Sequence, residues 1–227
     1  MNLNKRQSQK DQGFTLIEMI GVLAVVAVLA AMIIPKVFDI IASSKIDALG
    51  AAVKTYETAV TKYYTDIGSV LPLNASGVPQ TENSGDSATV RSLAARLTLS
   101  SSDSLNTGAN LWAKFNGPYL EKFDTTSPPG LGTAMYIPAR TAVSYGTSVT
   151  GNNLGWDLKG DDGNSDLNTG ANVVYFRLTG LGEEDFLELD RMLDADVGGT
   201  DAEKEVRGRA KWHSGSGGTL YLYLAHR

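Results

Sequence analysis

Residues 13–35, GFTLIEMIGVLAVVAVLAAMIIP, form the stretch around which the rest of this chain is organised. From residue 14 to residue 34 the stretch is almost wholly apolar. At about 1.5 Å of rise per helical residue, it is long enough to cross a hydrocarbon core of roughly 30 Å. We therefore expect residues 14–34 to form a membrane-spanning helix.

One charged residue, Glu18, interrupts this apolar run. Placing a carboxylate inside a membrane costs roughly 2.5 kcal/mol or more unless it has a partner. We therefore expect Glu18 to have a function. Its position suggests one, because Glu18 is the fifth residue counted from Phe14 and Gly13 stands immediately before Phe14.

A short basic leader that ends in Gly13, the sequence FTLIE at residues 14–18 and an apolar helix closely resemble the prepilin signature. This signature is typical of type IV pilins and of type II secretion pseudopilins, and Pro35 resembles the proline that many such pilins carry in this helix. The resemblance covers residues 10–35. It implies that a membrane prepilin peptidase cuts the precursor between Gly13 and Phe14 and methylates the Phe14 amine.

The resemblance implies a structural filament subunit, of a type IV pilus or a type II secretion pseudopilus, and no enzymatic activity. The subunit would wait in the bacterial inner membrane as a single-pass protein until an inner-membrane assembly platform packs its helix against copies of itself. The basic leader predicts a cytoplasmic N-terminus, so the remainder would become periplasmic or part of a cell-surface filament. Glu18 and Pro35 are the expected assembly residues, with the Glu18 carboxylate meeting the Phe14 amine of a neighbouring subunit.

An ordinary secretory signal is the alternative for residues 1–34. Val28, Leu29 and Ala30 form a small-residue pattern of the kind that signal peptidase cuts. The remainder would then be a signal-anchored or secreted extracytoplasmic domain with enzymatic or ligand-binding activity. The length of the apolar run, the carboxylate near its start and the glycine placed before it favour the prepilin interpretation.

Composition limits the other possibilities. The chain has 227 residues, of which 42% are hydrophobic and 20% charged, enough for one ordinary domain beside the N-terminal segment. The sequence has no cysteine, which excludes disulfides, thiol catalysis and cysteine-based zinc sites. Removing the leader changes the net charge from −5 to −7. A body this acidic lacks the charge pattern of a general nucleic-acid binder, so no nucleic-acid partner is expected.

Helical periodicity continues beyond the apolar run. Apolar residues recur at intervals of three and four, with one wider gap: Phe38, Ile41, Leu49, Val53, Tyr56, Val60, Tyr63 and Ile67. We expect one long helix that ends near Gly68, with a kink or a locally melted turn at Pro35. The predicted organisation is a leader at 1–13, a helix at 14–67 whose part 14–34 spans the membrane, and an extracytoplasmic head at 68–227.

The head is predicted to mix helices and antiparallel strands. Helical patterns cover 88–97 and 183–193, and residues 111–115 look strand-like. Strand patterns cover 135–137, 142–149, 172–178, 206–212 and 219–224, the last two joined as a hairpin. The predicted fold class is α+β, with the long N-terminal helix packed on an antiparallel sheet, as the pilin resemblance also implies.

An acidic loop at residues 157–168 is the remaining candidate site. Its alternating oxygens suit a hard cation such as calcium, and the predicted ligands are Asp157, Asp161, Asp162, Asn164 and Asp166. Major pseudopilins bind calcium in a C-terminal loop, and the placement here is similar. A solvated acidic turn is the alternative, because aspartate, asparagine and glycine are also the usual turn residues. Calcium should raise the melting temperature of the head only in the first case.

Overall fold

The computed structural model describes residues 13–74, 76–81, 92–101, 110–127, 131–141, 155–159, 166–167, 171–194, 207–214 and 217–227. The chain divides into two compact units, Met1–Ser43 and Ser44–Arg227, which are treated separately below. Helix α1, Leu16–Ile67, begins in the first unit and ends in the second.

Helix α1 ends where the sequence predicts. Gly68 adopts a positive φ of 75°, a conformation that favours glycine, and its N–H donates to the Tyr64 carbonyl at 2.7 Å. In the second unit the inward face of α1 is fully buried, and its buried residues are Ile46, Leu49, Gly50, Val53, Ala59, Val60, Tyr63 and Ile67. Helical periodicity therefore identified most of this face, although Ile46, Gly50 and Ala59 were not predicted.

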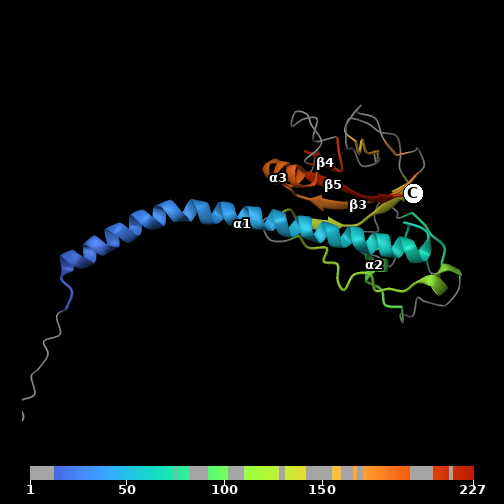
Figure 1. Ribbon diagram of the computed structural model, residues 1–227, viewed down its shortest axis with the longest axis horizontal. Coiled ribbons are helices and arrows are strands. Elements are labelled where there is room, and N and C mark those ends of the chain that lie inside the picture. The colour runs from blue at the N-terminus through green and yellow to red at the C-terminus, as the bar shows by residue number, and fades with distance from the viewer. Residues whose placement is uncertain are drawn as a thin grey trace, which may run out of the picture. The chain divides into compact units, whose positions relative to one another are not determined.

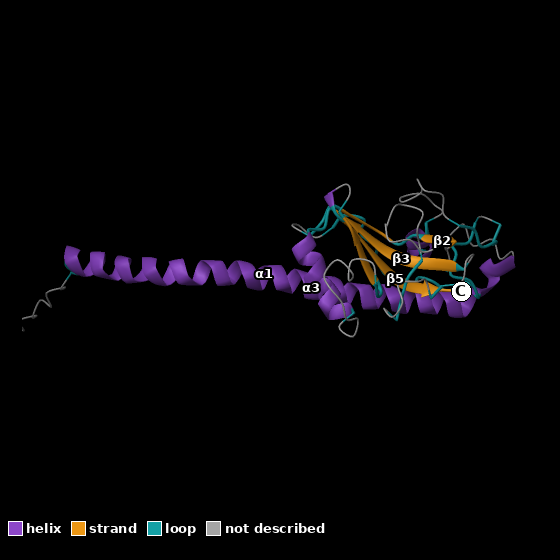
Figure 2. Ribbon diagram, turned by 90° about the horizontal axis from the view of Figure 1, so that it is seen from above, coloured by secondary structure: helices purple, strands orange, loops and turns teal. Residues whose placement is uncertain are grey.

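The head contains a five-stranded sheet in the order β1-β3-β5-β4, with β2 also paired to β3. The strands are β1 (Ala134–Tyr136), β2 (Ala139–Thr141), β3 (Asn172–Thr179), β4 (Ala210–His213) and β5 (Thr219–His226). These strand pairings are all antiparallel, and β4 and β5 form the predicted hairpin with Ala210 opposite Leu222. The strand predicted at 206–212 begins only at Ala210 and ends at His213. The second half of α1 runs along one face of this sheet (Figures 1 and 2). The α+β fold class is thus confirmed.

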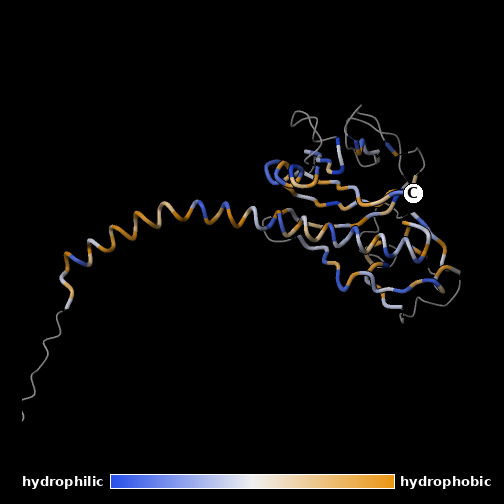
Figure 3. The backbone as a smooth tube through the Cα atoms, viewed as in Figure 1, coloured by the Kyte–Doolittle hydropathy of each residue, from blue (hydrophilic) through white to orange (hydrophobic). Residues whose placement is uncertain are grey.

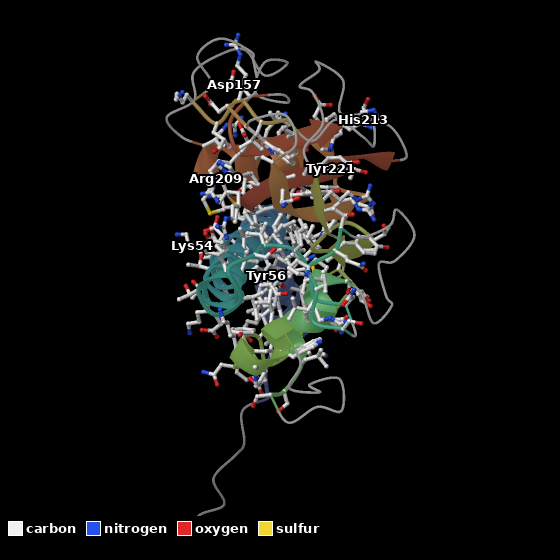
Figure 4. All side chains as sticks on the ribbon, turned by 90° about the vertical axis from the view of Figure 1, so that its right-hand side faces the viewer. Lys54, Tyr56, Asp157, Arg209, His213 and Tyr221 are labelled. Carbon is white, nitrogen blue, oxygen red and sulfur yellow. The ribbon has the colours of Figure 1, made fainter. Side chains whose placement is uncertain are left out.

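Both faces of the sheet are covered, which explains the nearly continuous apolar sequence of β3. On the face toward α1, the Tyr56 ring stacks on Phe176 with centroids 5.7 Å apart. On the opposite face, a smaller cluster contains Trp156, Leu167, Val173 and Tyr175. Tyr56 and Asp157 accordingly lie on opposite sides of the sheet (Figure 4). Strand β5 separates its side chains in the same way, since its leucines join the first cluster and its tyrosines pack against the second.

Helix α3, Glu183–Leu193, has the predicted bounds and buries Phe186 and Leu189. Three acidic residues lie in its first turn, where the helix dipole favours negative charge. The Phe186 ring stacks on Trp212 of β4 with centroids 6.1 Å apart. The local sequence was sufficient to predict α3, because its apolar side and its acidic first turn both lie within these eleven residues.

Helix α2, Leu93–Thr98, is shorter than the predicted 88–97 helix within the residues that the structure describes. Its start is set by Ser92, whose hydroxyl accepts the Ala95 N–H at 3.1 Å and caps the helix. Arg96, expected off the apolar side, is instead buried, and its Nε donates to the Leu73 carbonyl at 2.6 Å.

Two other strand predictions change. Residues 111–115 do not form a strand; Asn110–Lys114 is the short 3₁₀ helix η1, which brings Trp112 and Phe115 to one side. The 135–137 strand is shifted by one residue to Ala134–Tyr136. The strand predicted at 142–149 lies outside the described residues.

Candidate processing and assembly site

The first unit exposes a long apolar helical surface. Large hydrophobic side chains from Phe14 to Ile41 are all at least partly exposed, and Phe14 is 84% exposed. Figure 3 shows this apolar run along the N-terminal half of α1. The helix is long and apolar enough to cross a membrane, and none of its most apolar 18-residue window is buried. Such a surface requires lipid or other apolar partners.

Glu18 has a partner within the first turn of this helix. The Thr15 N–H donates to Glu18 Oε2 at 2.8 Å, and the Thr15 hydroxyl donates to the same oxygen at 2.6 Å. In return the Glu18 N–H donates to the Thr15 hydroxyl oxygen at 3.3 Å. These reciprocal bonds form a capping box, in which the N-cap residue and the third helical residue satisfy each other's amide groups.

The capping role of Thr15 was missed from the sequence, although the signal was present. A threonine followed three residues later by glutamate, just before an apolar run, is the usual pattern of a capping box. Residues 15–18, TLIE, match it. The carboxylate that interrupts the apolar run therefore also fixes the point at which α1 begins.

Gly13 and Phe14 lie just before Thr15, the N-cap of α1, and both are exposed. A Cβ built at Gly13 would meet no atom of the described residues within 4 Å. The chain's own packing therefore does not require glycine at this position.

Pro35 lies inside α1, and the helix continues through it. Of the two predicted outcomes, a kink or a locally melted turn, the melted turn is absent and the kink stays a prediction. Proline has no amide hydrogen, which leaves the Ala31 carbonyl without its usual helical donor. The suggested assembly role of Pro35 remains a prediction.

The acidic loop is described only at its two ends. Asp157 is fully buried, and Asp166 binds Lys159 with an Nζ–Oδ1 distance of 2.8 Å. The other predicted ligands, Asp161, Asp162 and Asn164, lie outside the described residues. Within the described part of the chain, no three histidine or acidic side chains are grouped so as to hold a metal ion. Calcium binding at this loop remains a prediction.

Comparison with protein families identifies the N-terminal segment. The family described as the prokaryotic N-terminal methylation motif matches residues 8–34. Comparisons with curated proteins and with solved structures found no match. The family match spans the apolar run, its carboxylate and the glycine before it, so it coincides with the exposed surface and the capping box.

The match bears on the processing, assembly and membrane anchoring of the chain. The motif implies processing by a prepilin peptidase and assembly with other pilin subunits, and it suggests a structural subunit more than an enzyme. Together with the apolar helix, it supports membrane anchoring and an extracytoplasmic filament. The chain thus carries, at residues 8–34, the N-terminal signature of type IV pilins and pseudopilins.

Proposed function

We propose that this chain is a filament subunit of a type IV pilus or of a type II secretion pseudopilus. The prepilin peptidase cuts it between Gly13 and Phe14 and methylates the new amine of Phe14. The subunit waits in the inner membrane with its N-terminus in the cytoplasm. An inner-membrane assembly platform then transfers its helix from lipid into the filament core, and the head stays outside.

The observation that carries this proposal is the exposed apolar surface of residues 14–41. Burying one large aliphatic side chain stabilises a protein by about 1.5–3 kcal/mol relative to leaving it in water. This surface presents many such side chains in succession, Leu16, Ile17 and Ile20 among them. Lipid covers them before assembly, and neighbouring helices cover them afterwards. The core of the head draws on residues from Ile46 onward, so it does not require this surface.

Glu18 supports the same proposal because the capping box gives its carboxylate donors before assembly. A carboxylate in an apolar environment is costly unless donors or a positive charge surround it. Thr15 supplies two of its hydrogen bonds within the isolated subunit. In the filament, the Phe14 amine of a neighbouring subunit would supply the positive charge. Glu18 then has a partner both in the free subunit and in the filament. Thr15 is its partner in the free subunit, and the neighbouring Phe14 amine joins it only in the filament.

Shearing tests the proposal and separates the two kinds of filament. Cells that make the protein are sheared, and the surface fraction and the envelope are probed for the chain and for its N-terminal residue. A pilus subunit should leave with the sheared filaments, whereas a pseudopilus subunit should stay in the envelope. The lack of cysteine favours the pseudopilus, since many pilins close a C-terminal loop with a disulfide. A soluble protein that begins near Ala31 would overturn both assignments and restore the ordinary secretory signal.

A further inference from the structure

Helix α3 contacts the buried part of α1 through a methionine that lies on a glycine. A Cβ built at Gly50 of α1 would lie 2.9 Å from Met192 Sδ and 3.2 Å from Met192 Cε. Gly50 is buried, and the Met192 thioether occupies the space where another residue would have its side chain. Glycine inside a helix destabilises it relative to alanine. The contact with Met192 is therefore a physical reason for glycine at this position.

Met192 is also open to solvent. The sequence has two methionines beyond residue 43, Met135 and Met192. Met192 is 43% exposed, whereas Met135 is only 6% exposed. Met19 and Met32 are exposed as well, but they belong to the apolar surface of α1, which lipid or detergent covers. Met192 therefore combines a packing contact on α1 with access from water.

Oxidation of this sulfur would change the contact directly. A peroxide transfers one oxygen atom to the Met192 sulfur, which loses two electrons as the sulfur–oxygen bond forms. The oxygen–oxygen bond of the peroxide breaks, and its second oxygen leaves as water or an alcohol. The resulting sulfoxide is polar and bulkier than the thioether. The backbone N–H groups of α1 beside Gly50 are used within the helix, so they cannot satisfy the new oxygen.

The rest of α3 is held by other contacts. Phe186 and Leu189 are buried, and the Phe186 ring stacks on Trp212 of β4. Met192 lies one turn beyond this buried pair, in the last turn of the helix. Loss of the contact with Gly50 should therefore loosen the end of α3 and leave the sheet folded.

We propose that Met192 is a site of reversible oxidation, at which a peroxide releases the last turn of α3 from α1. Methionine sulfoxide reductases restore the thioether. In that step a dithiol supplies two electrons, the sulfur–oxygen bond breaks, and the oxygen leaves as water. This inference stands on contacts within the head and does not rest on the proposed filament function.

The test treats the full chain in detergent micelles with hydrogen peroxide and locates the added oxygen by peptide mass spectrometry. Met192 should be oxidised several-fold faster than Met135, in line with their exposure. The melting temperature, followed by circular dichroism, should fall by about 2–4 °C, the shift expected for one partly buried apolar contact in a chain of this size. Hydrogen exchange should increase in the last turn of α3 and stay unchanged in β5. Equal oxidation rates for the two methionines would overturn the proposal.

Reductase treatment supplies the second arm of the test. Methionine sulfoxide reductase with dithiothreitol should return the melting temperature to its starting value. If the melting temperature stays low after the Met192 sulfur is reduced, the loss comes from damage elsewhere and the proposal fails. Met192→Leu keeps an apolar side chain of similar volume, so it should melt close to the wild type before peroxide and show no fall afterwards. The same fall in Met192→Leu would also contradict the proposal.

A glycine variant tests whether oxidation acts through the contact with α1. In Gly50→Ala the new methyl group displaces the flexible end of Met192, so peroxide should lower the melting temperature much less than in the wild type. Gly21→Ala is the matched control in the same helix, because a Cβ at Gly21 would meet no atom of the described residues within 4 Å. This control should show the full wild-type fall. A full fall in Gly50→Ala would show that oxidation does not act through Gly50 and would reject the proposal.

Discussion

The Glu57 carboxylate of helix α1 pairs with the guanidinium of Arg209, the residue that precedes strand β4. The same guanidinium donates to the Tyr223 carbonyl of β5 at 3.3 Å. The Arg209 N–H donates to the Asp194 carboxylate, at the end of α3, at 2.7 Å. One residue therefore joins the long helix to the hairpin and to α3.

The Glu57–Arg209 pair is expected to stabilise the head measurably. Both side chains are about one-third exposed or less, so removing either partner should lower the free energy of unfolding by about 1–2 kcal/mol. Glu57→Ala, Arg209→Ala and the double variant form a cycle that is measured by urea unfolding. A positive coupling energy is expected. The control is Asp47→Ala, which removes an exposed acidic residue of the same helix. If Asp47→Ala and Glu57→Ala lower the free energy of unfolding equally, the effect comes from the charge of the helix and not from the ion pair.

Processing is expected to depend on Gly13 through recognition and not through folding. Gly13→Val should block cleavage in cells, although a Cβ at this position would meet no atom of the described residues within 4 Å. Intact-mass measurement should give 214 residues for the wild type, starting at Phe14, and 227 for the variant. The melting curve of the head should not change. Gly21→Ala, where a Cβ is equally free, should be cleaved normally; normal cleavage of Gly13→Val would contradict the proposed cut site.

The two roles of Glu18 can be separated by substitution. Glu18→Ala removes both the cap and the charge, whereas Glu18→Gln keeps an oxygen that can accept the Thr15 bonds. Both should be cleaved normally and both should impair assembly, because a broken ion pair in a dry core costs about 3 kcal/mol or more. Thr15→Val loses only the cap, worth about 0.5–2 kcal/mol, and should reduce assembly less. Filament yield in sheared fractions measures the effect, and normal yield from Glu18→Gln would show that the charge is not needed.

Burial lowers the pKa of Lys211 to about 7, and the charge of Asp157 partly opposes this shift. Between pH 7 and 10.5 the unfolded chain keeps the Lys211 proton and the folded chain does not. The free energy of unfolding should therefore rise with pH over this range, by at most about 1.4 kcal/mol per pH unit from this group. Lys211→Met should lose that part of the slope and be more stable than wild type below pH 7. If the free energy of unfolding, measured in urea, changes with pH in the same way for both proteins, Lys211 stays protonated in the folded head.

The local sequence was enough to predict the elements that are specified by a few neighbouring residues. The bounds of α3 follow from its acidic first turn and its apolar spacing, and the end of α1 follows from Gly68. The run of apolar residues in β3 marked it as central, and it pairs with β1, β2 and β5. The methylation motif was readable for the same reason, since it is one continuous segment.

Contacts between distant residues could not be predicted in this way. The burial of Arg96 depends on the Leu73 carbonyl, 23 residues earlier, and on the ring of Trp112. The lysine contacts of the acidic loop are of the same kind. Lys159 and Asp166 are seven residues apart in irregular chain, where no helical or strand period links them. Lys211 reaches Gly155 only because β4 lies beside that segment in the folded sheet.

The end of α1 has a practical consequence for labelling the protein. The guanidinium of Arg227 donates to the Gly68 carbonyl, and the Arg227 N–H and carbonyl both bond to Asn172 at 2.9 and 2.7 Å. A fluorophore or affinity tag fused directly after Arg227 would thus start from an ordered position beside β3. A flexible spacer before the tag would leave those bonds in place, so that imaging or purification does not disturb the head it reports on.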